Sequence, residues 1–279
     1  MSVADELEPL PLAVAIRFSH AVAQSVADTH GIDLLHIKGP AVPEELLAPV
    51  VASAGAPGGR AERQSHDADV LVRPGQTGDF IRAIAEAGWT LLHGFEDDSV
   101  FAHAATLHHD ALGFLDLHRC LPGMDLDPER AFDALFAERT EQVIAGQRCA
   151  VPSVTGQRLI LILNAGRSET GVRHPDLEHA WAAAAPTERE QVAALARSVS
   201  ADAALAAITG QGLRGGDADF RLWRLLSQGE ERSIRFAVAL VRAQPTLAGR
   251  LRTVARLGRV ARRRLAGDPR RPGSRRSER

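Results

Sequence analysis

Arg63-Gln-Ser-His-Asp67-Ala-Asp69-Val-Leu-Val72 is the most informative stretch of this sequence, because two acidic residues lead directly into an apolar strand. Side chains alternate between the two faces of a strand, so Asp67 and Asp69 are expected on the same face, about 7 Å apart. Two neighbouring carboxylates repel each other unless a cation lies between them. Carboxylates together with substrate phosphates are the ligands that Mg²⁺ prefers. The stretch therefore predicts a strand that binds a divalent metal ion.

The same Asp-x-Asp spacing occurs twice more, beginning at Asp125 and at Asp217. Both of these pairs precede predicted helices, where an aspartate can cap the first turn. The pair at Asp67 and Asp69 leads into a strand, which has no helical first turn for an aspartate to cap. We therefore interpret only this pair as a metal site.

A third acidic residue, Asp116, lies in the apolar stretch Phe114–His118, which also predicts a strand. An isolated carboxylate in such a strand is costly to bury unless it is paired, hydrogen-bonded or bound to a metal ion. His118 follows two residues later and shares the face of Asp116. A strand that brings one carboxylate beside an Asp-x-Asp pair suits two-metal phosphoryl transfer, in which one ion activates the attacking oxygen and the other stabilises the leaving phosphates.

The remaining pattern predicts an α+β fold with a mixed sheet. The first element is an amphipathic helix over Leu12–Thr29, which ends at Gly31 and carries a stripe of apolar residues at i+4 steps: Val14, Phe18, Val22 and Val26. Strands are expected at Ile32–Ile37, His66–Val72, Leu91–Leu92, Val100–Leu107 and Phe114–His118, helices at Thr77–Ala87 and Asp127–Ala137, a flexible loop at Ala52–Gly59 and a hairpin at Val143–Val151.

After Ser153 the sequence predicts helices only, rich in Ala, Leu and Arg. We therefore expect one domain with a mixed sheet over residues 1–152, a helical domain over residues 153–265, and a basic disordered tail over residues 266–279.

The composition is that of an ordinary globular protein, with 45% hydrophobic and 24% charged residues. Cys120 and Cys149 are too few for a disulfide scaffold and favour a reducing compartment. No stretch approaches the roughly 20 apolar residues of a membrane helix, and the acidic N-terminus does not resemble a signal peptide. We therefore expect a cytoplasmic protein with no transmembrane segment.

Charge is unevenly distributed along the chain, whose formal net charge is −2. From Arg250 to the end, twelve arginines stand against only two acidic residues, Asp268 and Glu278. This Arg-rich C-terminus could contact nucleic acid or another acidic surface, or form a solvated helix with a disordered end. Lys38 is the only lysine among 33 basic residues, which suggests a position that needs a compact point charge rather than a guanidinium fork.

Four motifs, in order, resemble an uncharacterised bacterial nucleotidyltransferase family, itself a branch of the DNA polymerase beta superfamily. The family pattern is similar to LLKGxA…R…DIDLLV…GY…DLHW. The corresponding pieces here are LLHIKGPA at 34–41, Arg63 before DADVLV at 67–72, AGW at 87–89 and LDLH at 115–118. The resemblance covers roughly residues 30–120, and the helical remainder also resembles the second half of the family.

This resemblance implies a polymerase-beta-like domain and a metal-dependent nucleotidyltransferase. Asp67, Asp69 and Asp116 would bind Mg²⁺ or Mn²⁺ and be catalytic. A nucleoside monophosphate would pass from a nucleoside triphosphate, such as ATP, to an acceptor hydroxyl or amine, with release of pyrophosphate. Nucleotide binding would fall to Lys38, Gly39, Arg63, Ser65 and His118. The acceptor stays open and could be a small molecule, a peptide, a protein or an RNA.

Two other classes of function stay open. The chain could be a non-catalytic or regulatory, antitoxin-like protein that keeps the fold, although the presence of all three aspartates favours activity. It could instead be a nucleic-acid-binding module that acts through its Arg-rich C-terminus.

Two further kinds of site are disfavoured. A zinc site would need one of the standard ligand spacings, and none occurs among the clustered histidines His103, His108, His109 and His118. Ser65-His66-Asp67 cannot act as a catalytic triad, because neighbours on a strand point to opposite faces.

Overall fold

The computed structural model describes residues 10–47, 49–50, 59–60, 65–97, 100–211, 218–231, 233–244 and 246–266, and all of their side chains except those of 49–50, 59–60 and 263–266. The first half contains α1 (Leu12–His30), β1 (Leu34–Ile37), η1 (Gly39–Ala41), η2 (Glu44–Leu46), β2 (Pro49–Val50), β3 (Gly59–Arg60), β4 (Asp67–Val72), η3 (Pro74–Gln76), α2 (Thr77–Glu86), β5 (Thr90–His93), β6 (Ala104–His109), β7 (Gly113–His118), α3 (Pro128–Ala137), β8 (Thr140–Ile144) and β9 (Gln147–Val151). The second half contains α4 (Val154–Arg167), η4 (Gly171–Arg173), α5 (Pro175–Leu177), the π-helix η5 (Glu178–Ala182), α6 (Pro186–Ser198), α7 (Asp202–Thr209), α8 (Ala218–Ser227), α9 (Ile234–Ala243) and α10 (Leu247–Ala266).

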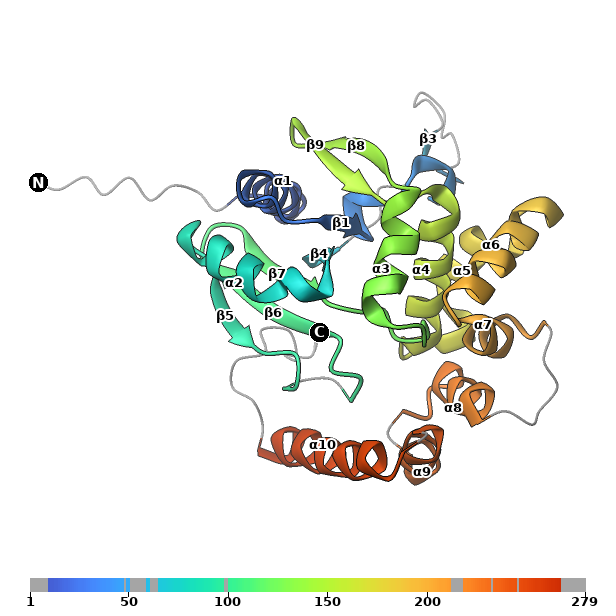
Figure 1. Cartoon of the computed structure of the whole chain (residues 1–279). Coiled ribbons are helices and arrows are strands. Elements are labelled where there is room, and N and C mark those ends of the chain that lie inside the picture. Colours follow the sequence, from blue (N-terminus) through green and yellow to red (C-terminus); the bar gives the residue numbers. More distant parts are fainter. Residues whose placement is uncertain are drawn as a thin grey trace, which may run out of the picture.

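A five-stranded sheet organises the first half, and the helices from α4 onward lie beside and below it (Figure 1). The strand order is β1-β4-β7-β6-β5. Strands β4 and β7 run parallel, whereas the other neighbouring pairs are antiparallel. The α+β class predicted from the sequence, a mixed sheet followed by helices, is confirmed.

The alternation of side chains along β4 separates its apolar residues from its acidic pair. Residues 68, 70 and 72 pack with α1 and α2 on one face of the sheet. Leu71 points to the other face and belongs to the cluster that includes α4 and the later helices. Asp67 and Asp69 share the face of Leu71 because strand side chains repeat every two residues. The acidic pair therefore lies on the side of the sheet that meets the helical half.

Helix α1 buries a face that matches the predicted stripe only toward its C-terminal end, where Val26 packs against the core. Val14 and Phe18 of the predicted stripe are 37% and 44% exposed. The buried face instead consists of Ala15, Ile16, Ser19, His20, Ala23, Gln24 and Ala27. The prediction was wrong for Val14 and Phe18 because apolar spacing does not reveal that polar side chains find partners inside the protein, as His20 and Gln24 do with groups of β1 and β9.

Most of the predicted element ends are confirmed. Gly31 ends α1 with φ 64°, and Asp127 caps α3 by accepting a hydrogen bond from the backbone N–H of Arg130 at 3.3 Å. Strand β6, by contrast, begins at Ala104 rather than at the predicted Val100. The reason is a φ of 51° at Ala102, which lies outside the extended region.

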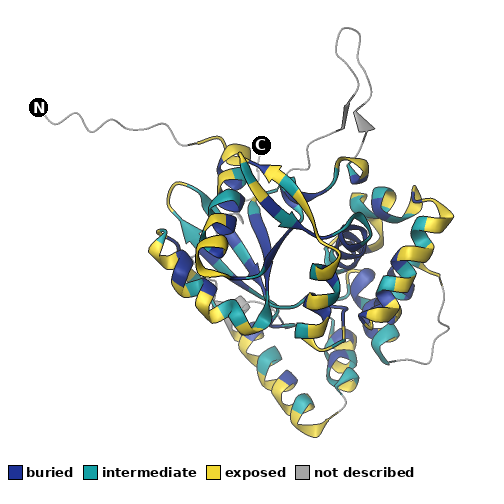
Figure 2. Cartoon of the chain, turned by 45° about the horizontal axis from the view of Figure 1, so that its top comes forward, coloured by how far each residue is buried: buried dark blue, intermediate teal, exposed yellow. Residues whose placement is uncertain are grey.

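One hydrophobic cluster crosses the predicted domain boundary at residue 152. It joins Leu35 and Leu71 of the sheet to Leu159–Leu163 of α4 and Trp223 of α8. Figure 2 shows the buried residues in the sheet and on the inward sides of the surrounding helices. The division into residues 1–152 and 153–265 stays a prediction.

Two other predictions concern segments that lie outside the described residues. The loop at Ala52–Gly59 and the tail at 266–279 lie almost entirely outside them. Within the part of the chain that the structure describes, no helix is long and apolar enough to cross a membrane.

Gly171→Ala is expected to lower the free energy of unfolding by more than about 3 kcal/mol. Gly171 has φ 51°, and a Cβ built there would overlap the carbonyl oxygen of Ser227 in α8. Gly210→Ala is the matched control, since Gly210 has φ 71° but open space around it, and should cost only about 1 kcal/mol of left-handed strain. Urea denaturation measures both values, and equal losses would show that the close approach of α8 is unimportant.

Candidate functional site

Asp69 and Asp116 are neighbours on two parallel strands. The register pairs Asp69 of β4 with Asp116 of β7, and Asp116 in turn with Thr106 of β6. Paired residues point to the same face of a sheet. Thr106 Oγ1 donates a hydrogen bond to Asp116 Oδ1 at 2.8 Å. Three adjacent strands thus bring two carboxylates and a hydroxyl into one row.

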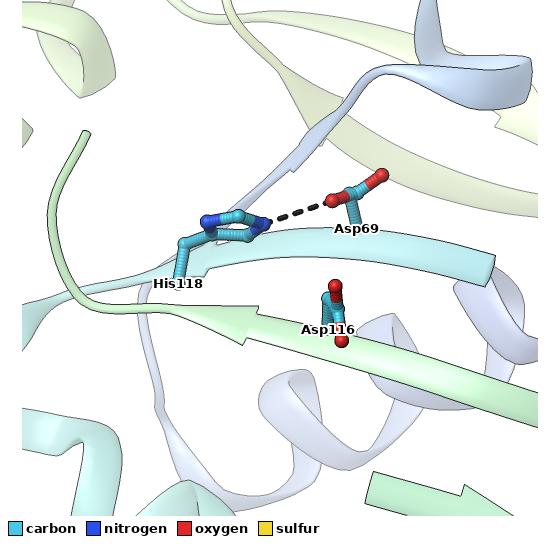
Figure 3. Close-up of side chains that lie close together, drawn as sticks. All are labelled: Asp69, Asp116 and His118. Atoms are coloured by element: carbon cyan, nitrogen blue, oxygen red, sulfur yellow. Dashed lines mark hydrogen bonds and ion pairs between the residues drawn. The ribbon is translucent and has the colours of Figure 1, made fainter. Parts of the chain in front are cut away.

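His118 joins the two aspartates in a compact group (Figure 3). One ligand atom from each of Asp69, Asp116 and His118 lies within 4.8 Å of the others. His118 Nε2 lies 2.8 Å from Asp69 Oδ1, and both side chains are buried. A carboxylate can only accept, so His118 donates through Nε2. His118, to which the family resemblance assigns nucleotide binding, therefore contacts the central carboxylate directly.

Lys38, the only lysine of the chain, forms an ion pair with the same oxygen of Asp69. Its side chain is 14% exposed, and its backbone has φ 59° and ψ −169°. Residues other than glycine rarely adopt this region, at a cost of about 1–3 kcal/mol, and do so only where the surroundings hold them there. The ion pair with Asp69 is such a contact. Because of this ion pair, the charge of Lys38 is already compensated by Asp69.

Asp67 lies at the start of β4, beside this group but outside it. The hydroxyl of Ser65 lies 2.8 Å from the carbonyl oxygen of Asp67 and 3.2 Å from its Oδ1. Gly39 follows Lys38 in the turn with φ 46°, and a Cβ built there would lie 3.5 Å from Ser65 Oγ. The structure thus brings Gly39, Ser65 and Asp67 together at one end of the site. Arg63, the remaining predicted residue, lies outside the described part of the chain.

The three carboxylates differ in their ionisation. Burial raises the pKa of Asp116 to about 7, and the charges of Asp69 and Asp67 add to this effect. Burial and the charge of Asp69 raise the pKa of Asp67 as well. Burial also opposes ionisation of Asp69, but Lys38 and His118 together outweigh it and hold the pKa of Asp69 well below its usual range. The site therefore contains excess negative charge, which a divalent cation would relieve.

The residues present fit a hard divalent cation. The bonds described above use Oδ1 of each carboxylate, and no further described residue bonds the second oxygen of Asp67, Asp69 or Asp116. Mg²⁺ and Mn²⁺ prefer such oxygen ligands. Of the four histidines considered for zinc, only His118 belongs to the group, and its Nε2 faces Asp69.

A buried hydrogen-bond chain behind the Lys38 turn was missed by the sequence analysis. Gln24 Oε1 accepts from the backbone N–H of Ala150 at 3.0 Å, while its Nε2 donates to Asp28 at 2.7 Å. The orientation of this amide is therefore determined, because an N–H can only donate and a carboxylate can only accept. The available signal was the pair of polar residues at positions 20 and 24, four residues apart on one helix face.

The orientation of the Gln24 amide also determines which ring nitrogens of His36 and His20 carry the proton. His36 Nε2 lies 3.0 Å from Gln24 Oε1 and must donate to it. His36 Nδ1 is then an acceptor for His20 Nδ1 at 2.8 Å, since burial lowers the pKa of both histidines and keeps them neutral. His20 Nε2 is therefore unprotonated, and this acceptor nitrogen is buried without a hydrogen-bond partner among the described residues. A Cβ on Gly39 would lie 3.8 Å from it, so this acceptor lies under the turn.

Two asparagine variants should shift the stability of the metal-free protein in opposite directions. The pKa of Asp116 is about 7 in the folded protein against an ordinary value of 3.8, so its ionisation destabilises the fold progressively from about pH 4 to pH 7. Asp116→Asn should therefore gain about 1–4 kcal/mol at pH 8, and the gain should fade toward pH 4. Asp69→Asn leaves Lys38 without its partner and should lose about 3–5 kcal/mol at neutral pH.

Urea denaturation at pH 5 and pH 8 in the presence of a chelator measures both effects. Asp110→Asn, on the exposed turn between β6 and β7, is the control and should change little. Equal losses in the Asp69 and Asp116 variants would contradict the different charge environments of the two residues.

Comparisons with known proteins found similarity at the level of solved structures. No protein-family model and no curated protein matches the sequence. Similar structures include the lincomycin-bound lincosamide antibiotic adenylyltransferase LnuA, with 16% identity, 57% of this chain and 92% of that chain covered, and a TM-score of 0.37. The antibiotic-resistance factor ANT(2'')-Ia has 14% identity, 67% and 91% coverage and a TM-score of 0.41. An antigenic nucleotidyltransferase-like protein from Paracoccidioides brasiliensis has 17% identity, 86% and 93% coverage and a TM-score of 0.32. At these TM-scores the similarities carry no argument about function.

Proposed function

We propose that this protein is a metal-dependent nucleotidyltransferase. It transfers a nucleoside monophosphate from a nucleoside triphosphate to an acceptor hydroxyl or amine. The acceptor atom forms a bond to the α-phosphorus, the bond from that phosphorus to the bridging oxygen breaks, and pyrophosphate leaves. The acceptor class, whether small molecule, peptide, protein or RNA, stays open.

The arrangement of carboxylates is the observation that supports this proposal. Asp69 and Asp116 are cross-strand neighbours on the face that Asp67 shares, and among the described residues none bonds the second oxygen of any of the three. Burial, together with the negative charge of the neighbouring carboxylates, raises the pKa of Asp67 and of Asp116, whereas Lys38 and His118 lower the pKa of Asp69. A fold that needed these residues only for stability would gain by replacing at least Asp116 with a neutral residue.

Each residue then has a distinct role in the proposed reaction. Asp67, Asp69 and Asp116 would hold Mg²⁺ or Mn²⁺, which when bound supplies charge neutralisation at the phosphates. Lys38 and His118 keep Asp69 ionised and oriented, and Thr106 orients Asp116. Asp116, beside the metal ligands, is also suited to accept a hydrogen bond from the acceptor hydroxyl. Gly39 lies in the turn at which the phosphates would approach the backbone, and Ser65 lies beside that turn.

The exposed arginines of α10 favour a second, separate role in contact with nucleic acid or another acidic surface. Arg256 attaches the helix to the body, because it donates to the carbonyl oxygen of Val100 at 3.1 Å and pairs with Glu96. Arg250, Arg252 and Arg262 are exposed and would be available to phosphates. This contact would add to the reaction by positioning an acidic acceptor, and it does not replace the carboxylate site.

The transfer reaction is tested with each α-labelled nucleoside triphosphate, Mg²⁺ or Mn²⁺, and cell extract as the source of acceptor. Wild-type protein should transfer label and release pyrophosphate. Asp67→Asn and Asp116→Asn should reduce transfer by at least about 100-fold, since each removes a charged metal ligand. Asp69→Asn is a poorer test because it also removes the partner of Lys38.

Asp110→Asn serves as the matched control and should retain wild-type transfer. Full activity in the Asp67 or Asp116 variant would exclude these residues as metal ligands. Absence of transfer by wild-type protein with every nucleotide would leave the non-catalytic alternative, and the Arg-rich helix would then become the feature to test.

A further inference from the structure

Arg167, the last residue of α4, brings a positive charge to the carboxylate site from the helical half. Its Nη1 lies 2.9 Å from His103 Nε2, and its Nη2 donates to Asn164 at 3.4 Å. Its Nε is buried and has no hydrogen-bond partner. Among the described residues no carboxylate forms an ion pair with it. Burial lowers the pKa of Arg167 to about 10, so the side chain still carries its charge at neutral pH.

His103 adds a second unpaired donor beside this cation. A guanidinium can only donate, so His103 Nε2 must accept from Arg167. Burial and then the charge of Arg167 hold the pKa of His103 well below its usual value, which keeps the ring neutral. Its single proton is therefore on Nδ1. That nitrogen is buried and has no partner.

These two donors border the carboxylate group. The rings of His103 and His118 lie 5.4 Å apart between centroids, and His118 bonds Asp69 through Nε2 (Figure 3). The second nitrogen of His118, on the side of the ring away from Asp69, is also buried and unpaired. The unpaired polar atoms thus lie together next to the proposed metal ligands, whereas buried polar groups elsewhere in proteins are normally satisfied.

A purely structural role does not account for this arrangement. A buried cation that serves the fold is normally paired with a carboxylate, because burying an uncompensated charge is unfavourable. Lys38, to which the family resemblance assigns nucleotide binding, is already paired with Asp69. Arg167 is a cation beside the site that forms no ion pair with a carboxylate of the described residues, and the longer-range charges of Asp69 and Glu231 favour its ionisation.

We propose that Arg167 and His103 bind the polyphosphate of the nucleotide substrate. This inference rests on the proposed function, since it concerns the same site. Arg167 donates charge-assisted hydrogen bonds to phosphate oxygens through its free Nε–H, and His103 donates through Nδ1–H. Because Arg167 comes from α4 and the carboxylates come from the sheet, binding of the polyphosphate joins the two halves of the chain across the site.

The test uses inorganic tripolyphosphate and ATP, each with Mg²⁺, and measures binding by calorimetry. Wild-type protein should bind both. Arg167→Gln should weaken the binding of both ligands about 10- to 100-fold. The affinity of Arg167→Lys should lie between those of the wild type and Arg167→Gln, since lysine keeps the charge but lacks the planar guanidinium. His103→Phe keeps a ring, removes the second donor and should weaken binding several-fold. Arg173→Gln, an exposed arginine in η4, is the matched control and should bind as wild type does.

The melting temperature of the ligand-free variants separates binding from stability. Arg167→Gln should melt at or above the wild-type temperature, because it removes a buried charge that forms no ion pair among the described residues, and it should lose the stabilisation that tripolyphosphate gives the wild type. A lower melting temperature with unchanged tripolyphosphate affinity would overturn the inference in favour of a structural role.

The two proposals can fail separately. If wild-type protein transfers nucleotide and Arg167→Gln binds ATP with wild-type affinity, the transferase proposal stands and the role of Arg167 is wrong. If tripolyphosphate binding depends on Arg167 but no nucleotide is transferred, the anion site stands and the transferase proposal fails. If wild-type protein binds neither ligand, the inference is overturned.

Discussion

The compensation of one buried negative charge, that of Asp69, holds the centre of this structure together. Its side chain is 3% exposed, and leaving such a carboxylate unpaired would cost several kcal/mol, about 3–5 in proteins where one partner of a buried pair is removed. Lys38 reaches it from the end of β1 and His118 from the end of β7. One oxygen of Asp69 therefore connects three adjacent strands. Because Lys38 and His118 compensate its charge, Asp69 stays ionised although it is buried beside Asp116.

The same region concentrates the features that a fold optimised for stability would avoid. Lys38, a residue other than glycine, has φ 59°, and strain of this kind persists where the surroundings maintain it. Of the seven buried side-chain atoms without a hydrogen-bond partner in the described residues, four belong to His20, His103, His118 and Arg167, which border the turn or the carboxylates. Their clustering at one place is the expected signature of a site whose missing partners are ligand atoms.

The acidic residues of the candidate site could be found from the sequence, whereas the groups around them could not. Asp67 and Asp69 were visible because the spacing of two and the following apolar strand are local signals. Arg167 contacts His103 across 64 residues of sequence, and no local pattern encodes such a contact. The buried face of α1 was misjudged for a related reason, since His20 looks unfavourable inside until its partner on β1 is known.

The sequence by itself determined which residues share a face, where most helices and strands end, and that the chain combines a mixed sheet with helices. These properties depend on backbone geometry and on the sterics of a few neighbouring residues, so they are local. Tertiary structure alone decided that Asp69 lies in register with Asp116 and that Asp69 is ionised while Asp116 has a pKa of about 7. It also decided that Arg167, which forms no ion pair with a carboxylate of the described residues, lies beside them. Register, burial and charge compensation depend on groups from distant segments, and they exist only once the chain has folded.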